Sequence, residues 1–325
     1  MAISHVPPAS VTTKVTGGAP PNEPIGRTVP LATGASTWAW EMAGPPGAPA
    51  LVLLHGWMAT AALNWYGSLE YLGRSFRVIA PDLRGHGRLG RGAPPFSVEA
   101  CADDIASLED ELGLARALIV GYSMGGAIAQ VFAQRHRRRA DGIVLCATAA
   151  SFARRVKFRP ALRVTGRVGA AAVRKWPDAG QRFLARRIDR HDQAALRRRA
   201  RGARGAGEHG LAARAADEGA APVPGQAHPD WALKEREKAD LAAFIEAGVA
   251  LNGYDSTTWL PALDIPAAVL VTLRDKIVAP WRQEAMATLI RGSRRYEVAA
   301  GHDAVVTSPT SFLPTLQTAC AELIG

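Results

Sequence analysis

Short continuous apolar runs alternate with stretches of helical spacing over most of the chain. A run of this kind is typical of a strand that is covered on both faces of a parallel sheet. The pattern predicts a strand pair within residues 28–42 and further strands at 50–54, 76–80, 117–120, 142–146, 267–272 and 295–298. It predicts helices at residues 60–73, 98–112, 281–290 and 309–323. This alternation indicates an α/β domain with a mostly parallel sheet and helices on both of its faces.

The alternation is interrupted over residues 151–255, which are basic, have helical spacing and contain no strand-like run. Inside this segment, residues 231–251 have the spacing of an amphipathic helix, and residues 202–225 have the Gly- and Ala-rich composition of a loop. We therefore expect a helical insertion in one α/β domain that is built from residues 26–150 and 256–325. Residues 1–25 are rich in Pro, Thr, Ala and Gly without periodicity, which predicts a disordered N-terminal tail.

Residues 121–125 read Gly-Tyr-Ser-Met-Gly and join the apolar run at 117–120 to a helical pattern at 127–133. A serine between two glycines at such a junction lies on a sharp turn that exposes its hydroxyl at the positive end of the helix. Ser123 is therefore the candidate nucleophile. By itself the motif also fits a tight strand-to-helix turn with an incidental serine, so the assignment depends on partners elsewhere in the chain.

A serine nucleophile needs a base, and the base needs an orienting acid. Asp275 closely follows the strand predicted at 267–272, and His302 follows the last predicted strand. Ligands of parallel sheets bind at the carboxyl ends of the strands, where both residues are expected to lie. Either residue alone would more often be a turn or loop residue. Their joint placement, in the order Ser, Asp, His, favours a triad of Ser123, Asp275 and His302.

The segment His55-Gly56-Trp57 ends the strand predicted at 50–54. A glycine at this place allows the backbone to approach a reacting carbonyl group. We expect the backbone N–H groups of Trp57 and Met124 to donate to the oxyanion that forms during acyl transfer. The alternative is that His55-Gly56 is only a turn at the end of a strand.

Taken together, these segments resemble the α/β-hydrolase superfamily, in its serine-nucleophile, lid-bearing esterase- or lipase-like branch, over about residues 28–325. The landmarks are residues 55–57, 81–87, 121–126, Asp275 and 301–302. The resemblance implies an eight-stranded sheet, a catalytic triad of Ser123, Asp275 and His302, and an oxyanion hole at Trp57 and Met124. It also implies that residues 151–255 form a lid and that His86 is a packing residue within a structural turn.

A serine at position 123 argues against haloalkane dehalogenases and soluble epoxide hydrolases, which use an aspartate at this place. We expect hydrolysis of a small-molecule carboxylic ester through an acyl-enzyme on Ser123. One alternative is hydrolysis of a carbon–carbon bond in a diketone ring-cleavage product, for which arginines of the insertion would hold a second carboxylate. Another, of a different class, is a non-catalytic binding protein with this fold. The sequence indicates neither the acyl chain nor the oligomeric state.

The net charge is +10, and the basic residues concentrate between residues 153 and 204. We interpret this excess as a solvated helical face, with weak contact to an anionic membrane surface as the alternative. No nucleic-acid motif accompanies the charge, so nucleic acid is not an expected partner. The pattern shows no secretory signal and no run of the roughly 18–20 apolar residues that span a bilayer, which predicts a cytoplasmic location. No metal or cofactor is expected, because Cys101, Cys146 and Cys320 lack metal-ligand spacing and no phosphate-binding loop is present.

Overall fold

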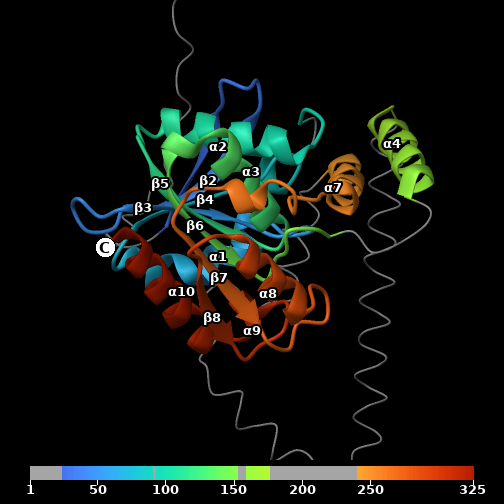
Figure 1. The fold of residues 1–325 in the computed structure, drawn as a ribbon. Coiled ribbons are helices and arrows are strands. Elements are labelled where there is room, and N and C mark those ends of the chain that lie inside the picture. Colours follow the sequence, from blue (N-terminus) through green and yellow to red (C-terminus); the bar gives the residue numbers. More distant parts are fainter. Residues whose placement is uncertain (1–23, 91–92, 153–158, 176–239) are drawn as a thin grey trace, which may run out of the picture.

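The computed structural model describes residues 24–90, 93–152, 159–175 and 240–325 of the chain. In this part of the chain eight strands form one sheet in the order β1-β2-β4-β3-β5-β6-β7-β8 (Figure 1). The strands are β1 (Ile25–Pro30), β2 (Ser36–Met42), β3 (Ala50–Leu54), β4 (Arg77–Pro81), β5 (Ala117–Tyr122), β6 (Ala140–Cys146), β7 (Ala267–Thr272) and β8 (Arg294–Val298).

The sheet confirms the predicted fold class of an eight-stranded, mostly parallel α/β sheet. Strand β2 pairs antiparallel with both β1 and β4, and every other neighbouring pair is parallel. All predicted strands are present, with ends that differ by a few residues. The first strand begins earlier than expected, at Ile25, so the predicted tail boundary at residue 25 lies inside a strand. Residues 1–23, the rest of that predicted tail, lie outside the described residues.

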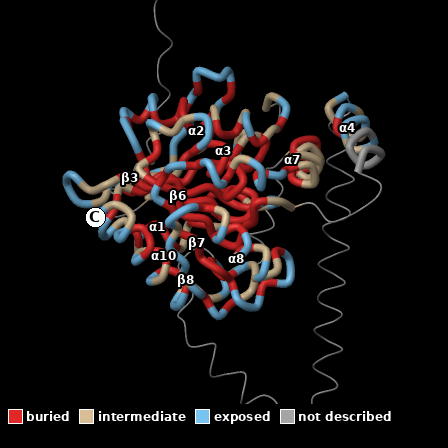
Figure 2. The backbone as a smooth tube through the Cα atoms, viewed as in Figure 1, coloured by how far each residue is buried: buried red, intermediate tan, exposed pale blue. Residues whose placement is uncertain are grey.

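Helices cover both faces of the sheet, as predicted (Figure 1). One face packs against α2 (Val98–Glu111), α3 (Met124–Arg135) and α8 (Pro280–Leu289). The other packs against α1 (Ala61–Gly73), α9 (Ala304–Thr307) and α10 (Pro309–Ile324). Figure 2 shows that the central strands between these two layers are buried. The described part of the chain contains no helix with both the length and the apolar character needed to cross a membrane.

Two described α-helices lie between β6 and β7, namely α4 (Arg159–Lys175) and α7 (Leu241–Gly253). In Figure 1, α7 lies between α4 and the sheet domain. Ser151 and Asp255 form an isolated antiparallel bridge, so the chain leaves the domain and returns to it at adjacent points. Most of the basic segment and the loop predicted at 202–225 lie outside the described residues.

The helix predicted over residues 231–251 is not continuous, because it is interrupted at Asp240. The described helix α7 begins at Leu241, and Asp240 before it has the extended dihedrals φ −85° and ψ 121°. The Asp240 carboxylate accepts a hydrogen bond of 2.7 Å from the N–H of Ala242. An aspartate satisfies a free N–H at a helix start in this way, and the amphipathic spacing alone does not reveal it. Residues 231–239 are outside the described part.

Glu109 on α2 is a buried carboxyl group that the sequence pattern does not reveal. Neither of its oxygens has a hydrogen-bond partner within the described residues, and Arg139 Nη1 lies 4.0 Å from Oε2. Burial raises the pKa of Glu109 from 4.5 to about 8, with Arg139 opposing the rise and Asp110 and Asp141 adding to it. The folded protein therefore keeps a proton on Glu109 that the unfolded chain releases near pH 4.5.

We expect the folding stability of the variant Glu109→Gln to fall less with rising pH than that of the parent protein. Between about pH 4.5 and 8 the unfolded parent binds fewer protons at this site than the folded one, so folding stability falls as pH rises through this window. Glutamine does not ionise and removes this contribution. Denaturant midpoints measured across this same pH window test the effect. Glu111→Gln, on the exposed part of the same helix, is the control, and an equal pH slope for Glu109→Gln and parent would contradict the prediction.

Candidate active site

Ser123 occupies the sharp turn between β5 and α3, with φ 53° and ψ −111°. A residue other than glycine in this left-handed region is strained and requires support from its surroundings. Glycines on either side allow the close packing of the turn. A Cβ atom on Gly121 would lie 2.4 Å from the carbonyl oxygen of Gly125, and one on Gly125 would lie 2.4 Å from that of Leu54. The Gly-x-Ser-x-Gly pattern is therefore a steric requirement of this turn.

Backbone hydrogen bonds from neighbouring elements hold the turn in place. The N–H of Ser123 donates to the carbonyl oxygen of Cys146 at the end of β6, at 2.9 Å. The carbonyl oxygen of Ser123 accepts from the Gly126 N–H at 2.9 Å and from the Thr148 hydroxyl at 2.7 Å. The main chain of Ser123 is thus fully bonded, and its hydroxyl is left for a partner outside the turn.

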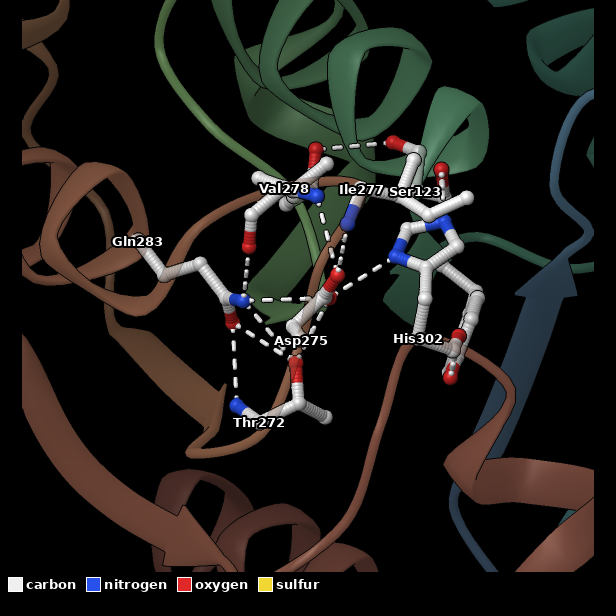
Figure 3. Close-up of polar contacts among 9 residues, drawn as sticks. Ser123, Thr272, Asp275, Ile277, Val278, Gln283 and His302 are labelled. Atoms are coloured by element: carbon white, nitrogen blue, oxygen red, sulfur yellow. Dashed lines mark hydrogen bonds and ion pairs between the residues drawn. The ribbon is translucent and has the colours of Figure 1, made fainter.

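The structure brings together the three residues that the sequence selects. His302 Nε2 lies 3.0 Å from Ser123 Oγ, and His302 Nδ1 lies 2.8 Å from Asp275 Oδ2 (Figure 3). Ser123 follows β5, Asp275 follows β7 and His302 follows β8, so all three lie beyond the carboxyl ends of strands. The resulting chain of contacts runs from a hydroxyl through an imidazole to a carboxylate.

Asp275 is held by four further hydrogen bonds (Figure 3). Its Oδ1 accepts from the N–H groups of Ile277 and Val278 at 2.8 and 2.9 Å. Its Oδ2 accepts from the Thr272 hydroxyl at 2.9 Å and from the Gln283 amide at 3.3 Å. These donors fix the carboxylate plane relative to the imidazole.

The pKa of Asp275 is lowered although the side chain is buried. Burial is the largest single effect and opposes ionisation, but the hydrogen bonds and charge of His302 and the N–H groups of Val278 and Ile277 together outweigh it. An ionised Asp275 accepts a hydrogen bond from Nδ1–H, which keeps the ring proton on Nδ1 and leaves the lone pair of Nε2 directed at Ser123. This is the imidazole tautomer that accepts a proton from a serine hydroxyl.

The candidate oxyanion loop lies beside Ser123. A Cβ atom on Gly56 would lie 3.5 Å from Ser123 Cβ, and the Gly56 N–H is bonded to Asn64 Oδ1 at 2.7 Å. Within the described residues, the backbone N–H groups of Trp57 and Met124 have no hydrogen-bond partner. Two unbonded donors next to a strained serine have the chemistry that an oxyanion requires.

Comparison with known families covers most of the chain. The model of the alpha/beta hydrolase fold matches residues 49–309. This chain is a member of the alpha/beta hydrolase fold family. The matched span includes the serine turn, both helices α4 and α7, and the strand ends that carry Asp275 and His302.

Individual relatives of this α/β-hydrolase include esterases. The chain is similar to the uncharacterized protein Rv2715 of Mycobacterium tuberculosis, with 36% identity over 107 residues that span 33% of this chain and 30% of that protein. It is 32% identical to the carboxylesterase YbfK of Bacillus subtilis over 41% of this chain and 46% of the relative. A thermophilic esterase from Thermogutta terrifontis has a TM-score of 0.65 and 25% identity, over 93% of this chain and all of that one.

Two buried histidines adjoin the candidate oxyanion loop of this α/β-hydrolase. His55 accepts from the Leu83 N–H at 2.9 Å, and its Nδ1 lies 2.8 Å from the carbonyl oxygen of Gly56. Burial, aided by His86, lowers the pKa of His55 to about 3, so the ring is neutral and bridges two loops. His86 is also buried, and burial lowers its pKa to about 4. Its ring packs 5.0 Å from that of Phe244, which fits the expected packing role.

Sequence patterns do not select several residues that support the site. They are Asn64 on α1, Tyr122, Thr148, Thr272 and Gln283 on α8. The Tyr122 hydroxyl donates to the His302 carbonyl oxygen at 2.5 Å. Tyr122 is the middle residue of the Gly-x-Ser motif, and its place next to Ser123 is the one sequence signal that could have selected it. In the described ranges no group of three or more His, Cys, Asp or Glu side chains is arranged to hold a metal ion.

Proposed function

We propose that this α/β-hydrolase is a serine hydrolase that cleaves a carboxylic ester through an acyl-enzyme on Ser123. The observation that carries the proposal is the contact chain from Ser123 Oγ to His302 at 3.0 Å and from His302 to Asp275 at 2.8 Å. The N–H groups of Trp57 and Met124 beside the serine, which have no partner among the described residues, add the donors that an acyl-transfer intermediate needs.

In the proposed reaction His302 Nε2 takes the hydroxyl proton while Ser123 Oγ attacks the ester carbonyl carbon. The carbonyl oxygen becomes an oxyanion that accepts hydrogen bonds from the Trp57 and Met124 backbone. His302 then gives its proton to the leaving alcohol as the C–O bond breaks. A water molecule, deprotonated by His302, attacks the acyl-enzyme, and the acid leaves as Ser123 regains its proton. Asp275 holds the imidazole and stabilises its protonated form throughout.

The similarity to a carboxylesterase and to an esterase structure supports ester hydrolysis over the other reactions open to this site. Cleavage of a diketone acid would favour polar groups of the insertion, such as arginines, that hold a second carboxylate. Arg174 on α4 instead donates from Nε and Nη2 to the two carboxylate oxygens of Glu246, at 2.9 Å each. Most of the remaining arginines between 153 and 204 lie outside the described residues. We further propose that α4 and α7 belong to a lid that selects the acyl group.

A serine-directed fluorophosphonate and a substrate panel test the proposal. We expect the probe to add one phosphonyl group to the protein, at Ser123, as peptide mass spectrometry would detect. We expect turnover of p-nitrophenyl esters to exceed that of a matched thioester and of a diketone acid, because the ester makes the smallest demand on the site. Heat-denatured protein is the labelling control. Absence of the Ser123 adduct, or turnover of the diketone acid alone, contradicts the proposal.

A further inference from the structure

The side chain of Trp57 ties the oxyanion loop to helix α7. Its indole Nε1–H donates to the main-chain carbonyl oxygen of Phe244 at 3.1 Å, across 187 positions of sequence. The same residue supplies, through its backbone N–H, one of the two proposed oxyanion donors. Trp57 therefore joins the proposed reaction centre to α7, a helix of the insertion between β6 and β7.

Gly248 makes this contact possible. In a helix the carbonyl of Phe244 faces the N–H four residues later, which belongs to Gly248. A Cβ atom on Gly248 would lie 2.9 Å from Trp57 Cζ2, which is closer than normal contacts allow. The absence of a side chain at this position exposes the Phe244 carbonyl and leaves a space that the indole ring occupies, the Gly248 seat. Glycine costs helix stability of about 1 kcal/mol relative to alanine, so it is an unfavourable choice here unless the space is used.

Helix α7 is itself fixed to the sheet domain. The N–H of Asp240, at its start, donates to the Gly85 carbonyl at 3.0 Å. Glu246 accepts from the Phe96 N–H at 2.7 Å and from Arg174 of α4 at 2.9 Å. The hydrogen bond to Glu246 and the charge of that carboxylate raise the pKa of the Arg174 guanidinium. These contacts give α7 a defined position from which it can hold another group.

The loop that receives this support is a strained turn. The N–H of Ala59 donates to the Gly56 carbonyl at 3.3 Å, and Met58 inside the turn has φ 60°. A non-glycine residue in this left-handed region costs of order 1–3 kcal/mol and persists only where its surroundings hold it. The Gly56 N–H is bonded to Asn64 at the start of the turn. The indole bond to α7 restrains the next residue, Trp57, whose backbone N–H is the proposed oxyanion donor.

We propose that the Phe244 carbonyl and the Gly248 seat on α7 position the Trp57 backbone N–H for the oxyanion. The inference rests on the proposed function, since it concerns the speed of that same acyl transfer. Phe244 and Gly248 are positioning residues that act through Trp57 and do not touch the substrate. The role predicts that loss of the indole bond lowers kcat while KM stays close to its parent value, because the oxyanion exists only in the transition state and intermediates.

Two single variants and their combination test this role. Trp57→Phe keeps an aromatic ring and the backbone N–H but removes the indole donor, and Gly248→Ala fills the seat. Removing one oxyanion donor outright costs about 10²–10³ in rate, and displacing it should cost about tenfold or more. We expect each variant to lose about tenfold or more in kcat for a p-nitrophenyl ester, with KM within about twofold. The affinity for a boronic acid that forms a tetrahedral adduct with serine should fall by the same factor as kcat/KM.

The double variant gives the decisive comparison. If both changes act on one contact, Trp57→Phe combined with Gly248→Ala should be no slower than the slower single variant. Trp281→Phe is the matched control, since it makes the same substitution at an exposed tryptophan of α8 and should leave kcat unchanged. Parent kcat in Trp57→Phe, a change confined to KM, or multiplied losses in the double variant would overturn the positioning role. Inactivity of Ser123→Ala in the same assay separates that result from failure of the proposed function.

Discussion

The variant Ser123→Ala should lose about four to six orders of magnitude in kcat for a p-nitrophenyl ester and keep its fold. The loss follows from removal of the attacking oxygen, since residual turnover can come only from the oxyanion donors and binding. The fold should survive because the turn is held by main-chain bonds to Cys146, Gly126 and Thr148, none of which uses the hydroxyl. Stopped assays at high enzyme concentration, together with circular dichroism melting, measure both parts of the prediction.

The control for Ser123→Ala is Ser311→Ala, which removes an exposed hydroxyl of α10 and should retain the parent rate. Both proteins would be purified side by side, so that a contaminating esterase gives equal activity in the two preparations. Turnover by Ser123→Ala within about tenfold of parent, with Ser311→Ala unchanged, would remove Ser123 from the reaction.

The variant Asp275→Asn should lose roughly four orders of magnitude in kcat while the site keeps its shape. The introduced asparagine is isosteric with aspartate, and its oxygen can still accept from the Ile277 and Val278 N–H groups that now bind Oδ1 at 2.8 and 2.9 Å. Its NH2 group then takes the place of Oδ2 and faces His302 Nδ1. A donor at this place forces Nδ1 to accept, which moves the imidazole proton to Nε2. A protonated Nε2 cannot take the proton of Ser123.

Asp303→Asn is the natural control, because Asp303 adjoins His302 in the chain and is exposed. We expect it to retain most of the parent kcat. A reversed outcome, in which Asp303→Asn is slow and Asp275→Asn is fast, would mean that the orienting role had been assigned to the wrong carboxylate. Circular dichroism melting of Asp275→Asn beside the parent protein, with kcat measured below both transitions, distinguishes a tautomer effect from unfolding.

The elements that the sequence predicts well are those whose surroundings repeat along the chain. Strands β3, β5 and β7 are buried at every position, so their apolar runs stand out without knowledge of their partners. Strand β1 is harder, because most of its residues are exposed and its position depends on pairing with β2. The break before α7 is missed for a related reason, since one capping residue, Asp240, interrupts a helical sequence pattern that continues on both sides of it.

The same distinction applies to the site. Ser123, Asp275 and His302 can be selected because each follows a strand, and a parallel sheet gathers the residues that follow its strands. Asn64 and Gln283 cannot be selected in this way, since each acts from a helix face whose direction is set only by packing on the sheet. The indole bond from Trp57 to Phe244 depends on a glycine seat in an insertion, and no spacing in the chain connects those residues.

The bridge between Ser151 and Asp255 has an evolutionary consequence. Because the segment between them departs and returns at one place, relatives can exchange it or change its length without disturbing the register of the sheet. For the proposed lid, this means that substrate range can change while the strands stay the same. The bond between Trp57 and α7 limits that freedom, since a replacement segment also changes what holds the proposed oxyanion loop. New specificities in this lineage should therefore arise first as slow enzymes, which later substitutions near positions 57 and 248 make fast.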